Sequence, residues 1–392
     1  STNKIINVLK EAKKQYQMSN LINEFTSTGS KFFAHQEAMQ NLRDGKGQVI
    51  TTHLMPTDIC QDTCAFCSVA TREGNVLRMY EMEGYINQLL KFGLKSVIIS
   101  GGGNPLLYKC PETKVGISEL ITMLNGKGLE VGMITNGMPL IKDDDGRTLW
   151  KNLSASAMDM LTWVRVSMSG LDHKRKIVEV PDIDKSKTTL GFSYVYHDIY
   201  HEPLDKNHGK VSSIDDLISP IEDVKIEYGK DRLGWLTQEL KAYVEVYEPT
   251  YLRLLPNCLE VSRIAGRCEE LQKIADIINP DIAFVQYKPP AAPNKCLLGF
   301  FHPVLNSDGY CYPCDSCVLN AKADHKFANP WRICHGSEIS KIYENPVRSL
   351  IENPKEQCPG CVFTKTNLLL EQVLNGMETP MPTITPTHPN FI

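Results

Sequence analysis

Three cysteines, Cys60, Cys64 and Cys67, lie close together in the segment Cys-Gln-Asp-Thr-Cys-Ala-Phe-Cys. The segment follows an apolar stretch, residues 49–55, that predicts a strand. Soft thiolate ligands select zinc or iron–sulfur clusters, and three of them can hold three irons of a [4Fe–4S] cluster. Because the loop supplies no fourth cysteine, the fourth iron would be open to a substrate or cofactor. A zinc knuckle and unrelated core cysteines are the alternatives.

A second predicted strand, residues 96–100, follows a helical pattern of apolar residues. This strand runs directly into Gly101, Gly102 and Gly103, which precede Asn104. Glycine has no Cβ, and so its backbone can come close to a ligand. The pattern therefore predicts a glycine-rich loop at the carboxyl end of this strand.

These features resemble the radical S-adenosylmethionine (radical SAM) superfamily. That family keeps an aromatic residue before its third cysteine, where this chain has Phe66. The glycine segment is similar to the family's GGEP loop, whose backbone binds the amino end of S-adenosylmethionine; Asn104 replaces the usual glutamate. The resemblance implies that Cys60, Cys64 and Cys67 hold a [4Fe–4S] cluster whose open iron binds S-adenosylmethionine.

The resemblance also implies a reaction. One electron, from an external reductant of the flavodoxin or ferredoxin type, cleaves S-adenosylmethionine into methionine and a 5′-deoxyadenosyl radical. That radical abstracts a hydrogen atom from the substrate. The protein's own part is to position the reactants and exclude water.

Strand-like and helix-like segments alternate from about residue 48 to 290, which is typical of a parallel α/β fold. After the two strands above, we expect four more, at residues 129–134, 161–167, 190–196 and 251–256. Six strands resemble the partial (β/α)6 TIM-like barrel of the family. Reactive groups in such barrels gather at the carboxyl ends of the strands.

Polar residues at those ends are candidate ligands of S-adenosylmethionine. Thr135 and Asn136 follow the third strand, although Asn-Gly is also common in turns. Ser167 ends the fourth strand, where the family often places a polar residue on the ribose or carboxylate of S-adenosylmethionine. Residues near the ends of later strands either line a substrate pocket or make structural hydrogen bonds: Ser193, Tyr194, Tyr196, His197, Arg253 and Asn257.

Seven of the thirteen cysteines lie beyond residue 290, which marks a change of composition. Cys296, Cys314, Cys358 and Cys361, with an Asp-Gly hairpin turn between the first two, resemble the SPASM/twitch extension of radical SAM enzymes. No cysteine follows Cys361, and this predicts the one-cluster twitch form. The resemblance implies that these four residues ligate a second, auxiliary [4Fe–4S] cluster.

Three other cysteines of this region leave the ligand set open. Cys311, Cys314 and Cys317 have a ferredoxin-like spacing, and Cys334 follows them. Any of Cys311, Cys317 and Cys334 could replace an assigned ligand. Zinc in place of the auxiliary cluster is a further alternative.

The chain divides into four predicted parts. Residues 1–47 form a helical segment of two helices, and residues 48–290 form the barrel. Residues 291–365 form a small α+β cluster domain, a β-hairpin plus helix, and residues 366–392 contain the end of a helix and a Pro-rich tail. We expect residues from about 197 to 233, rich in Asp, Lys, Gly and Pro, to cover the barrel mouth, and the tail to pack across the barrel.

Composition narrows the class of protein. The net charge of −4 over 392 residues gives no overall attraction for nucleic acid or an anionic membrane. Thirteen cysteines, with no secretory leader and no apolar run of membrane-spanning length, indicate a reducing cytoplasm rather than a disulfide-bonded secreted protein. We therefore expect a cytoplasmic protein with no membrane partner.

A fully cysteine-ligated auxiliary cluster favours electron transfer, which would leave an oxidised product. Twitch-bearing members of the family act on small polar molecules. We therefore expect a radical SAM enzyme that oxidises or rearranges a sugar, cyclitol or nucleoside. One alternative is modification of a peptide or nucleic-acid base, with Arg253 and Lys288 contacting phosphate or carboxylate. The other is a non-catalytic iron–sulfur electron-transfer or sensor protein.

Overall fold

The computed structural model describes most of the chain. The described residues are 24–26, 29–62, 64, 67, 72–172, 177–196, 199–200, 219–220, 232–257, 264–286, 292–315, 331–358, 361 and 363–392. Four residues singled out above lie outside them: Phe66, His197, Lys288 and Cys317. The first predicted N-terminal helix and most of the segment expected to cover the barrel mouth also lie outside the described residues.

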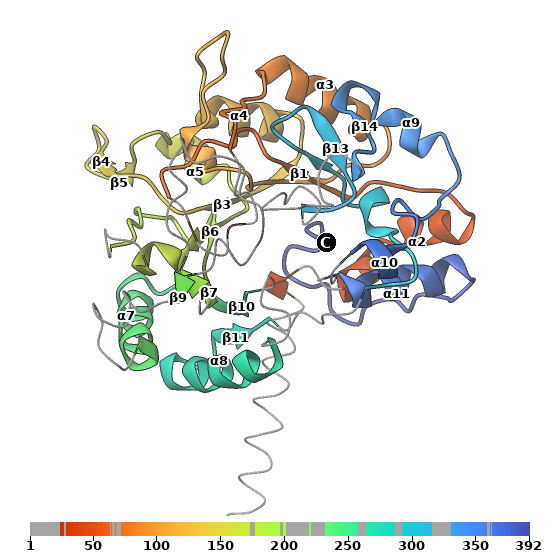
Figure 1. Ribbon diagram of the computed structural model, residues 1–392. Helices are drawn as coiled ribbons and strands as arrows, with labels where there is room; N and C mark the ends of the chain where they lie inside the picture. Colours follow the sequence, from red (N-terminus) through yellow and green to blue (C-terminus); the bar gives the residue numbers. More distant parts are fainter. Residues whose placement is uncertain are drawn as a thin grey trace, which may run out of the picture.

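A ten-stranded sheet organises the fold, with the strand order β11-β10-β7-β6-β3-β2-β1-β12-β13-β14 (Figure 1). Neighbouring strands from β11 to β12 run parallel, and β13 and β14 continue antiparallel. The strands are β1 (Thr51–Leu54), β2 (Ser96–Ile99), β3 (Glu130–Thr135), β6 (Trp163–Ser167), β7 (Thr189–Tyr196), β10 (Tyr251–Pro256), β11 (Ala283–Val285), β12 (Val304–Leu305), β13 (Tyr310–Tyr312) and β14 (Cys334–His335). Two small sheets pair β4 (Leu140–Lys142) with β5 (Thr148–Trp150) and β8 (Ile199–Tyr200) with β9 (Ser219–Pro220).

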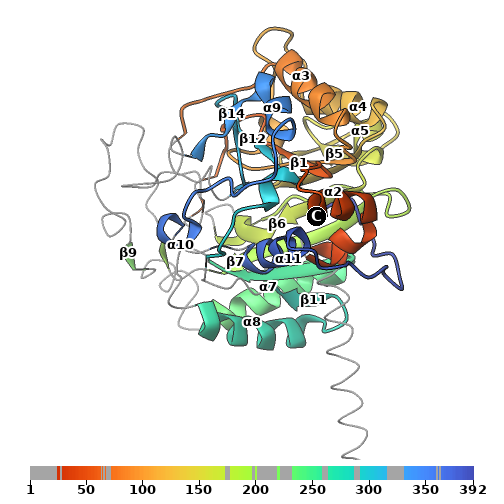
Figure 2. The ribbon, with the colours of Figure 1, turned by 90° about the vertical axis from the view of Figure 1, so that its right-hand side faces the viewer.

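Helices connect and cover the strands. The α-helices are α2 (Gln36–Arg43), α3 (Met79–Leu90), α4 (Ile117–Gly126), α5 (Ala155–Asp159), α7 (Arg232–Tyr247), α8 (Ile264–Ile278), α9 (Ser340–Tyr343), α10 (Pro354–Gln357) and α11 (Thr364–Leu374). Short 3-10 helices are η1 (Gly29–Ala34), η2 (Pro105–Leu107), η3 (Met168–Asp172), η6 (Leu298–Phe300) and η9 (Gly336–Glu338). Helices α2 and α11, far apart in sequence, lie side by side in both views (Figures 1 and 2).

The prediction of an α/β fold with a large parallel sheet is confirmed. All six predicted strands form, as β1, β2, β3, β6, β7 and β10, and they neighbour one another in chain order. Two features were not predicted. Strand β11 extends one edge of the sheet, and at the other edge the predicted hairpin of β12 and β13 joins the same sheet, because β12 pairs with β1.

The two faces of the sheet differ because successive side chains of a strand point to opposite sides. The outer face, which packs on the helices, is apolar. Its buried residues share one core with helical residues such as Met82, Leu120, Leu240 and Leu271. They include Val97, Ile99, Val131, Met133, Val164, Val166, Leu190, Phe192, Leu252 and Leu254.

The opposite, inner face carries large rings beside glycines. A Cβ on Gly132 would lie 2.1 Å from the Trp163 indole, and one on Gly191 would lie 2.1 Å from the Tyr251 ring. Each glycine pairs in register with the residue whose ring covers it. Glycine is required at both positions because any side chain would displace an aromatic ring from the inner face.

The C-terminal tail closes the sheet at the amino ends of β1 and β2. Ser96 Oγ donates a hydrogen bond of 2.6 Å to the carbonyl of Asn390, and Lys31 Nζ donates one of 3.0 Å to the carbonyl of Phe391. The Phe391 ring packs edge-on against Trp163, with centroids 5.3 Å apart. These contacts confirm the prediction that the tail packs across the barrel.

Replacing Phe391 with alanine should destabilise the protein, since its ring is buried against Trp163 and Ile98. We expect the free energy of unfolding to fall by about 3 kcal/mol, as for other buried phenylalanines. Urea denaturation followed by circular dichroism measures this change. The matched control is Ile384→Ala in the same tail, where the side chain is 74% exposed and little change is expected. An equal effect of both substitutions would contradict a packing role for the Phe391 ring.

Candidate functional site

The first predicted cysteine set lies in the loop that follows β1. The backbone N–H of Cys67 donates a hydrogen bond of 2.9 Å to the carbonyl of Cys64. Burial raises the pKa of the Cys60 thiol, and it raises the pKa of Cys64 well above its ordinary value, with Cys67 as the next cause. The charge of Cys67 acts on both Cys60 and Cys64, and that of Cys60 acts on Cys64. The structure therefore brings Cys60, Cys64 and Cys67 together.

Arg72 directs a positive charge at this set. Its Nη1 donates a hydrogen bond of 2.7 Å to the carbonyl of Asp62, and its Nη2 lies 3.5 Å from the Cys67 sulfur. Burial lowers the pKa of Arg72, but the neighbouring Cys67, Cys60 and Cys64 raise it by more, and so the net shift is upward. The guanidinium is thus placed to stabilise negative charge on these sulfurs.

The glycine segment supports the cysteine loop by close packing. Gly101 and Gly102 have φ values of +70° and +67°, which favour glycine. A Cβ on Gly103 would lie 2.1 Å from the carbonyl oxygen of Ile59, the residue before Cys60. The backbone of the glycine segment was expected to approach a ligand. Among the described residues, it approaches the cysteine loop.

Asn104 ties the glycine segment to two other loops. Its Nδ2 donates hydrogen bonds to Gln61 Oε1 at 3.1 Å and to the carbonyl of Gly137 at 2.9 Å. Its Oδ1 accepts hydrogen bonds from Thr135 Oγ1 at 2.7 Å and from the backbone N–H of Leu106 at 3.2 Å. All four hydrogen-bonding capacities of the amide are thus used internally. Contact of Asn104 or Thr135 with S-adenosylmethionine stays a prediction, and would replace one of these bonds.

Asn136 links the end of β3 to the cysteine loop. Its Nδ2 donates a hydrogen bond of 2.6 Å to Asp62 Oδ2 and lies 3.6 Å from the Cys60 sulfur. Gln61 Nε2 donates to Asn136 Oδ1 at 3.2 Å. Ser167, at the end of β6, donates a hydrogen bond of 3.0 Å to Ser169 Oγ. The roles of Asn136 and Ser167 toward a cofactor stay predictions.

The four C-terminal cysteines of the predicted auxiliary site also lie together. Burial raises the pKa of Cys296 well above its ordinary value, and Cys314, Cys361 and Cys358 raise it further. Burial likewise raises the pKa of Cys358 to about 12 and that of Cys361 to about 11. The apolar side chains packed around this set are Met55, Val304, Tyr312, Trp331 and Ile351. The assigned residues thus share one largely buried site.

Cys311 and Cys334 form a separate pair. They face each other on β13 and β14, and a hydrogen bond joins their sulfurs. Burial raises the pKa of the Cys311 thiol, whereas the hydrogen bond from Cys311 lowers that of Cys334. The structure thus groups these two with each other rather than with the four cysteines of the auxiliary site, while Cys317 lies outside the described residues.

The donor chemistry of both cysteine sets fits an iron–sulfur cluster. Each set is all thiol, and the cysteines of a [4Fe–4S] cluster attach to different irons rather than to one ion. Among the described residues, no three His, Cys, Asp or Glu side chains lie close enough together to hold a single metal ion.

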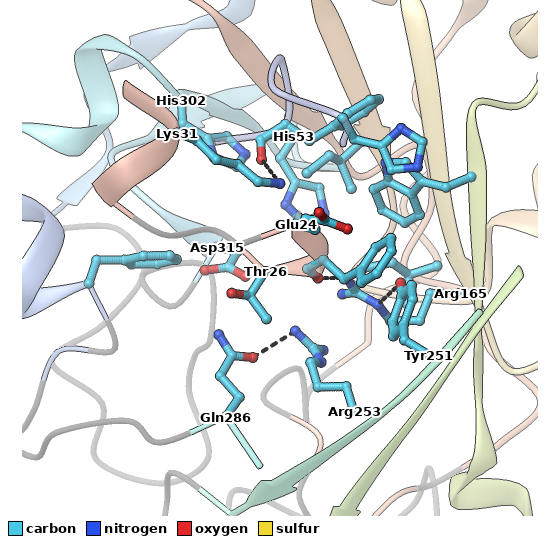
Figure 3. A pocket seen from close by; sticks show the side chains of 17 residues that line it. Glu24, Thr26, Lys31, His53, Arg165, Tyr251, Arg253, Gln286, His302 and Asp315 are labelled. Carbon is cyan, nitrogen blue, oxygen red and sulfur yellow. Dashed lines mark hydrogen bonds between the residues drawn. The ribbon is translucent and has the colours of Figure 1, made fainter. Parts of the chain in front are cut away.

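A cavity of about 140 Å³ lies on the inner face of the sheet (Figure 3). Strand residues, the segment around Lys31, the C-terminal tail and the region of the auxiliary site all contribute to its lining. Its ionisable lining residues are Glu24, Lys31, His53, Arg165, Arg253, His302, Asp315 and His388. The cavity thus combines aromatic walls with several buried charges.

Sequence reasoning identified part of this cavity. Arg253 lines the cavity, which agrees with the first of its two expected roles, a pocket residue or a structural hydrogen bond. Tyr194 and Tyr196 do not line this cavity: they point to the outer face and are buried in its core. Tyr194 instead donates a hydrogen bond of 2.6 Å to Asp172 Oδ2. The other interpretation, a structural hydrogen bond, therefore holds for Tyr194, because alternate residues of β7 face opposite sides of the sheet.

Other cavity residues were missed. His53 lies inside the first predicted strand, where the signal was that His53 is the one ionisable residue of the stretch 49–55. Lys31 and His302 lie on segments whose position beside the sheet depends on long-range contacts, and no local pattern indicates it. In the described part of the chain, no helix is both long and apolar enough to cross a membrane.

Comparison with known proteins gives weak matches. No protein-family model and no curated protein sequence matches this chain. Among solved structures, SuiB of Streptococcus suis has a TM-score of 0.44 at 14% identity, covering 76% of this chain and 66% of its own. The enzyme anSMEcpe with bound AdoMet (S-adenosylmethionine) has a TM-score of 0.43 at 14% identity, covering 83% of both chains.

A third match is BtrN in complex with AdoMet and 2-DOIA. Its TM-score is 0.36 at 15% identity, over 76% of this chain and 84% of its own. This chain spans 64–66% of the length of the SuiB structures, slightly less than two thirds. Because the TM-scores of SuiB, anSMEcpe and BtrN are all below 0.5, these matches do not establish a family.

Replacing Gly103 with alanine should disturb the cysteine loop, because the new Cβ would clash with backbone at Ile59. We expect a loss of about 1–3 kcal/mol in the free energy of unfolding, as for other overpacked sites. In the metal-free protein, iodoacetamide should also alkylate Cys60 faster, as measured by mass spectrometry. The control is Gly126→Ala at the exposed end of α4, where nothing lies within 4 Å of the added Cβ. Unchanged stability and reactivity in the Gly103 variant would exclude the support role.

Lys31 should make stability depend on pH. Burial, and then the charge of Arg165, lower its pKa to about 7 in the folded protein, whereas an unfolded lysine has a pKa near 10.4. Between these values the unfolded state binds more protons, and so stability rises with pH from about 7 to about 10. We expect Lys31→Met to remove this rise. Unfolding free energies of both proteins between pH 6 and 9 test it, with Lys151→Met at an exposed site as control. Parallel pH curves for wild type and Lys31→Met would contradict the assignment.

Proposed function

We propose that this protein is a radical SAM enzyme. The observation that carries the proposal is the grouping of three cysteine thiols from one loop, at the carboxyl end of β1, with Arg72 and the glycine segment packed against that loop. A compact loop with three thiols leaves one iron of a [4Fe–4S] cluster without a protein ligand. The chain order of the six predicted strands supports the partial (β/α)6 barrel that such an enzyme requires.

In this proposal, each residue has a defined task. Cys60, Cys64 and Cys67 hold the first cluster, and Arg72 balances its negative charge. When bound and reduced, that cluster supplies the electron that cleaves S-adenosylmethionine to methionine and a 5′-deoxyadenosyl radical. By the resemblance, Phe66 would contact the adenine of S-adenosylmethionine, and Ser167 its ribose or carboxylate.

The backbone of Gly101, Gly102 and Gly103 binds the amino end of S-adenosylmethionine. Thr135 and Asn136 lie on the same side of the site. Asn104 connects the glycine segment to the loop after β3 through its hydrogen bonds to Gly137 and Thr135. An external flavodoxin-type or ferredoxin-type protein provides the electron. The chain's own residues thus bind, orient and shield the reactants.

The second part of the proposal concerns the C-terminal region, interpreted as a twitch-type domain. Cys296, Cys314, Cys358 and Cys361 would ligate an auxiliary [4Fe–4S] cluster, which would accept the electron that the substrate radical loses. With four protein ligands this cluster has no open iron for a substrate. The product is then an oxidised or rearranged small polar metabolite, such as a sugar, cyclitol or nucleoside. The grouping and burial of these four thiols support the assignment.

Anaerobic reconstitution with iron and sulfide tests both clusters. We expect about eight irons per wild-type chain, and about four in a Cys60/Cys64/Cys67→Ala variant, because each cluster contains four. A variant with alanine at Cys296, Cys314, Cys358 and Cys361 should also retain about four irons. Cys268→Ala, on α8, is the control and should retain all eight.

The same samples test the reaction. After reduction with dithionite, wild type should convert S-adenosylmethionine to methionine and 5′-deoxyadenosine, and the Cys60/Cys64/Cys67→Ala variant should not. Chromatography quantifies both products. Wild type that holds both clusters but forms no 5′-deoxyadenosine would favour a non-catalytic iron–sulfur protein. About four irons in wild type, all lost in the first variant, would remove the auxiliary cluster from the proposal.

A further inference from the structure

We propose that the cavity on the inner face binds an oxyanion group, a carboxylate or a phosphate, of a small molecule through Arg165 and Arg253. As a statement about the substrate, this inference rests on the proposed function. Oxyanion binding itself requires no turnover, and so it is measurable independently.

Neutral partners hold Arg165 at the cavity wall. Its Nε donates a hydrogen bond of 2.9 Å to Tyr251 Oη, and its Nη2 donates one of 3.0 Å to the carbonyl of Phe25. Its guanidinium carbon lies 5.2 Å from the Trp163 ring centroid and 5.6 Å from that of Tyr251. Every one of these partners is neutral, and so they orient the guanidinium and leave its positive charge uncompensated.

Arg253, two strands away on the same face, has an unsatisfied donor. Its Nη1 donates a hydrogen bond of 2.8 Å to Gln286 Oε1, but its buried Nε has no hydrogen-bond partner among the described residues. Burial, and then the charge of Arg165, lower the pKa of Arg253 well below its usual range. Two like charges held together in a buried site are costly unless an anion compensates them.

No carboxylate of the described residues forms an ion pair with either arginine. Within the described residues, neither arginine has a carboxylate oxygen within 4.0 Å, the limit for an ion pair. Figure 3 shows Asp315 across the cavity from Arg165. Burial lowers the pKa of His53 and His302, and the charge of Asp315 opposes this. Asp315 also acts on Arg253, but burial and the charge of Arg165 outweigh it. An exogenous anion is thus the partner that the two arginines lack.

The remaining groups around the cavity favour the same ligand. Lys31 and His388 join the lining, and the Nε2 of the fully buried His53 has no hydrogen-bond partner among the described residues. Guanidinium groups bind planar carboxylates and phosphates through paired hydrogen bonds, which are about twice as strong as neutral ones. The arrangement therefore suits an acceptor with several oxygens rather than a neutral hydroxyl group.

The size of the cavity limits the molecule. A dry cavity of roughly 150 Å³ holds benzene, and the cavity of this protein measures about 140 Å³. It accommodates an oxyanion with a few attached carbons, packed against Trp163 and Tyr251. A peptide segment would exceed this volume, and so the inference selects small anionic metabolites.

Binding of inorganic phosphate and of succinate to the full-length reconstituted protein tests the proposal. Isothermal titration calorimetry measures affinity, and the thermal unfolding midpoint with and without each anion gives a second readout. We expect wild type to bind at least one anion. Arg253→Gln and Arg165→Gln should each weaken binding by at least about tenfold, because each removes a charge-assisted hydrogen bond. Binding of phosphate alone or of succinate alone identifies the oxyanion.

Two further measurements separate ligand binding from a structural role. Without added anion, Arg253→Gln should be at least as stable as wild type, because the substitution relieves the repulsion between two buried charges. The control Arg78→Gln, on the surface beside Glu81 and Glu112, should bind the anion as wild type does. No anion binding by wild type, or equal binding by the Arg253, Arg165 and Arg78 variants, would overturn the inference. Failure of the wild type to cleave S-adenosylmethionine would instead overturn the proposed function.

Discussion

The alternation of side chains along the parallel strands is the constraint on which the rest of the structure depends. It gives β2, β3, β6, β7 and β10 an apolar outer face that packs on helices, and so the inner face is free to differ. On that inner face, glycines at 132 and 191 make room for two aromatic rings, and the rings in turn orient Arg165. A polar site with buried charge can exist here because the outer core supplies the stability that such a site costs.

The two ends of the sheet have different roles. At the amino ends of β1 and β2, the C-terminal tail fills the opening with Phe391 and satisfies polar groups of the strands. At the carboxyl end of β1, the cysteine loop is held by the glycine segment and by the amide network of Asn104 and Asn136. Because the tail closes the amino ends of the strands, ligands would enter at the carboxyl ends, where the thiols lie, as in barrel enzymes generally.

The sequence allowed prediction wherever the signal is local. Strand and helix periods identified the six central strands and helix α11, and cysteine spacing identified two sets that lie together. An apolar run such as β7 does not show which side of the sheet each residue faces, and so the sequence left a pocket and a structural role both open for Tyr194 and Tyr196, which lie in the outer core. It missed Lys31, His302 and the pairing of β12 with β1, since these depend on contacts between residues more than 200 positions apart.

The contacts of the C-terminal tail also have a consequence for synthesis. Lys31 and Phe391 are 360 positions apart, and Thr51 meets Asn390 across 339 positions. A chain emerging from the ribosome can form its strands and helices early, but the opening at the amino ends of the strands stays unfilled until residues 390 and 391 have emerged. The inner face, with its buried charges, is therefore completed late in synthesis, which leaves an interval in which other molecules can still reach it.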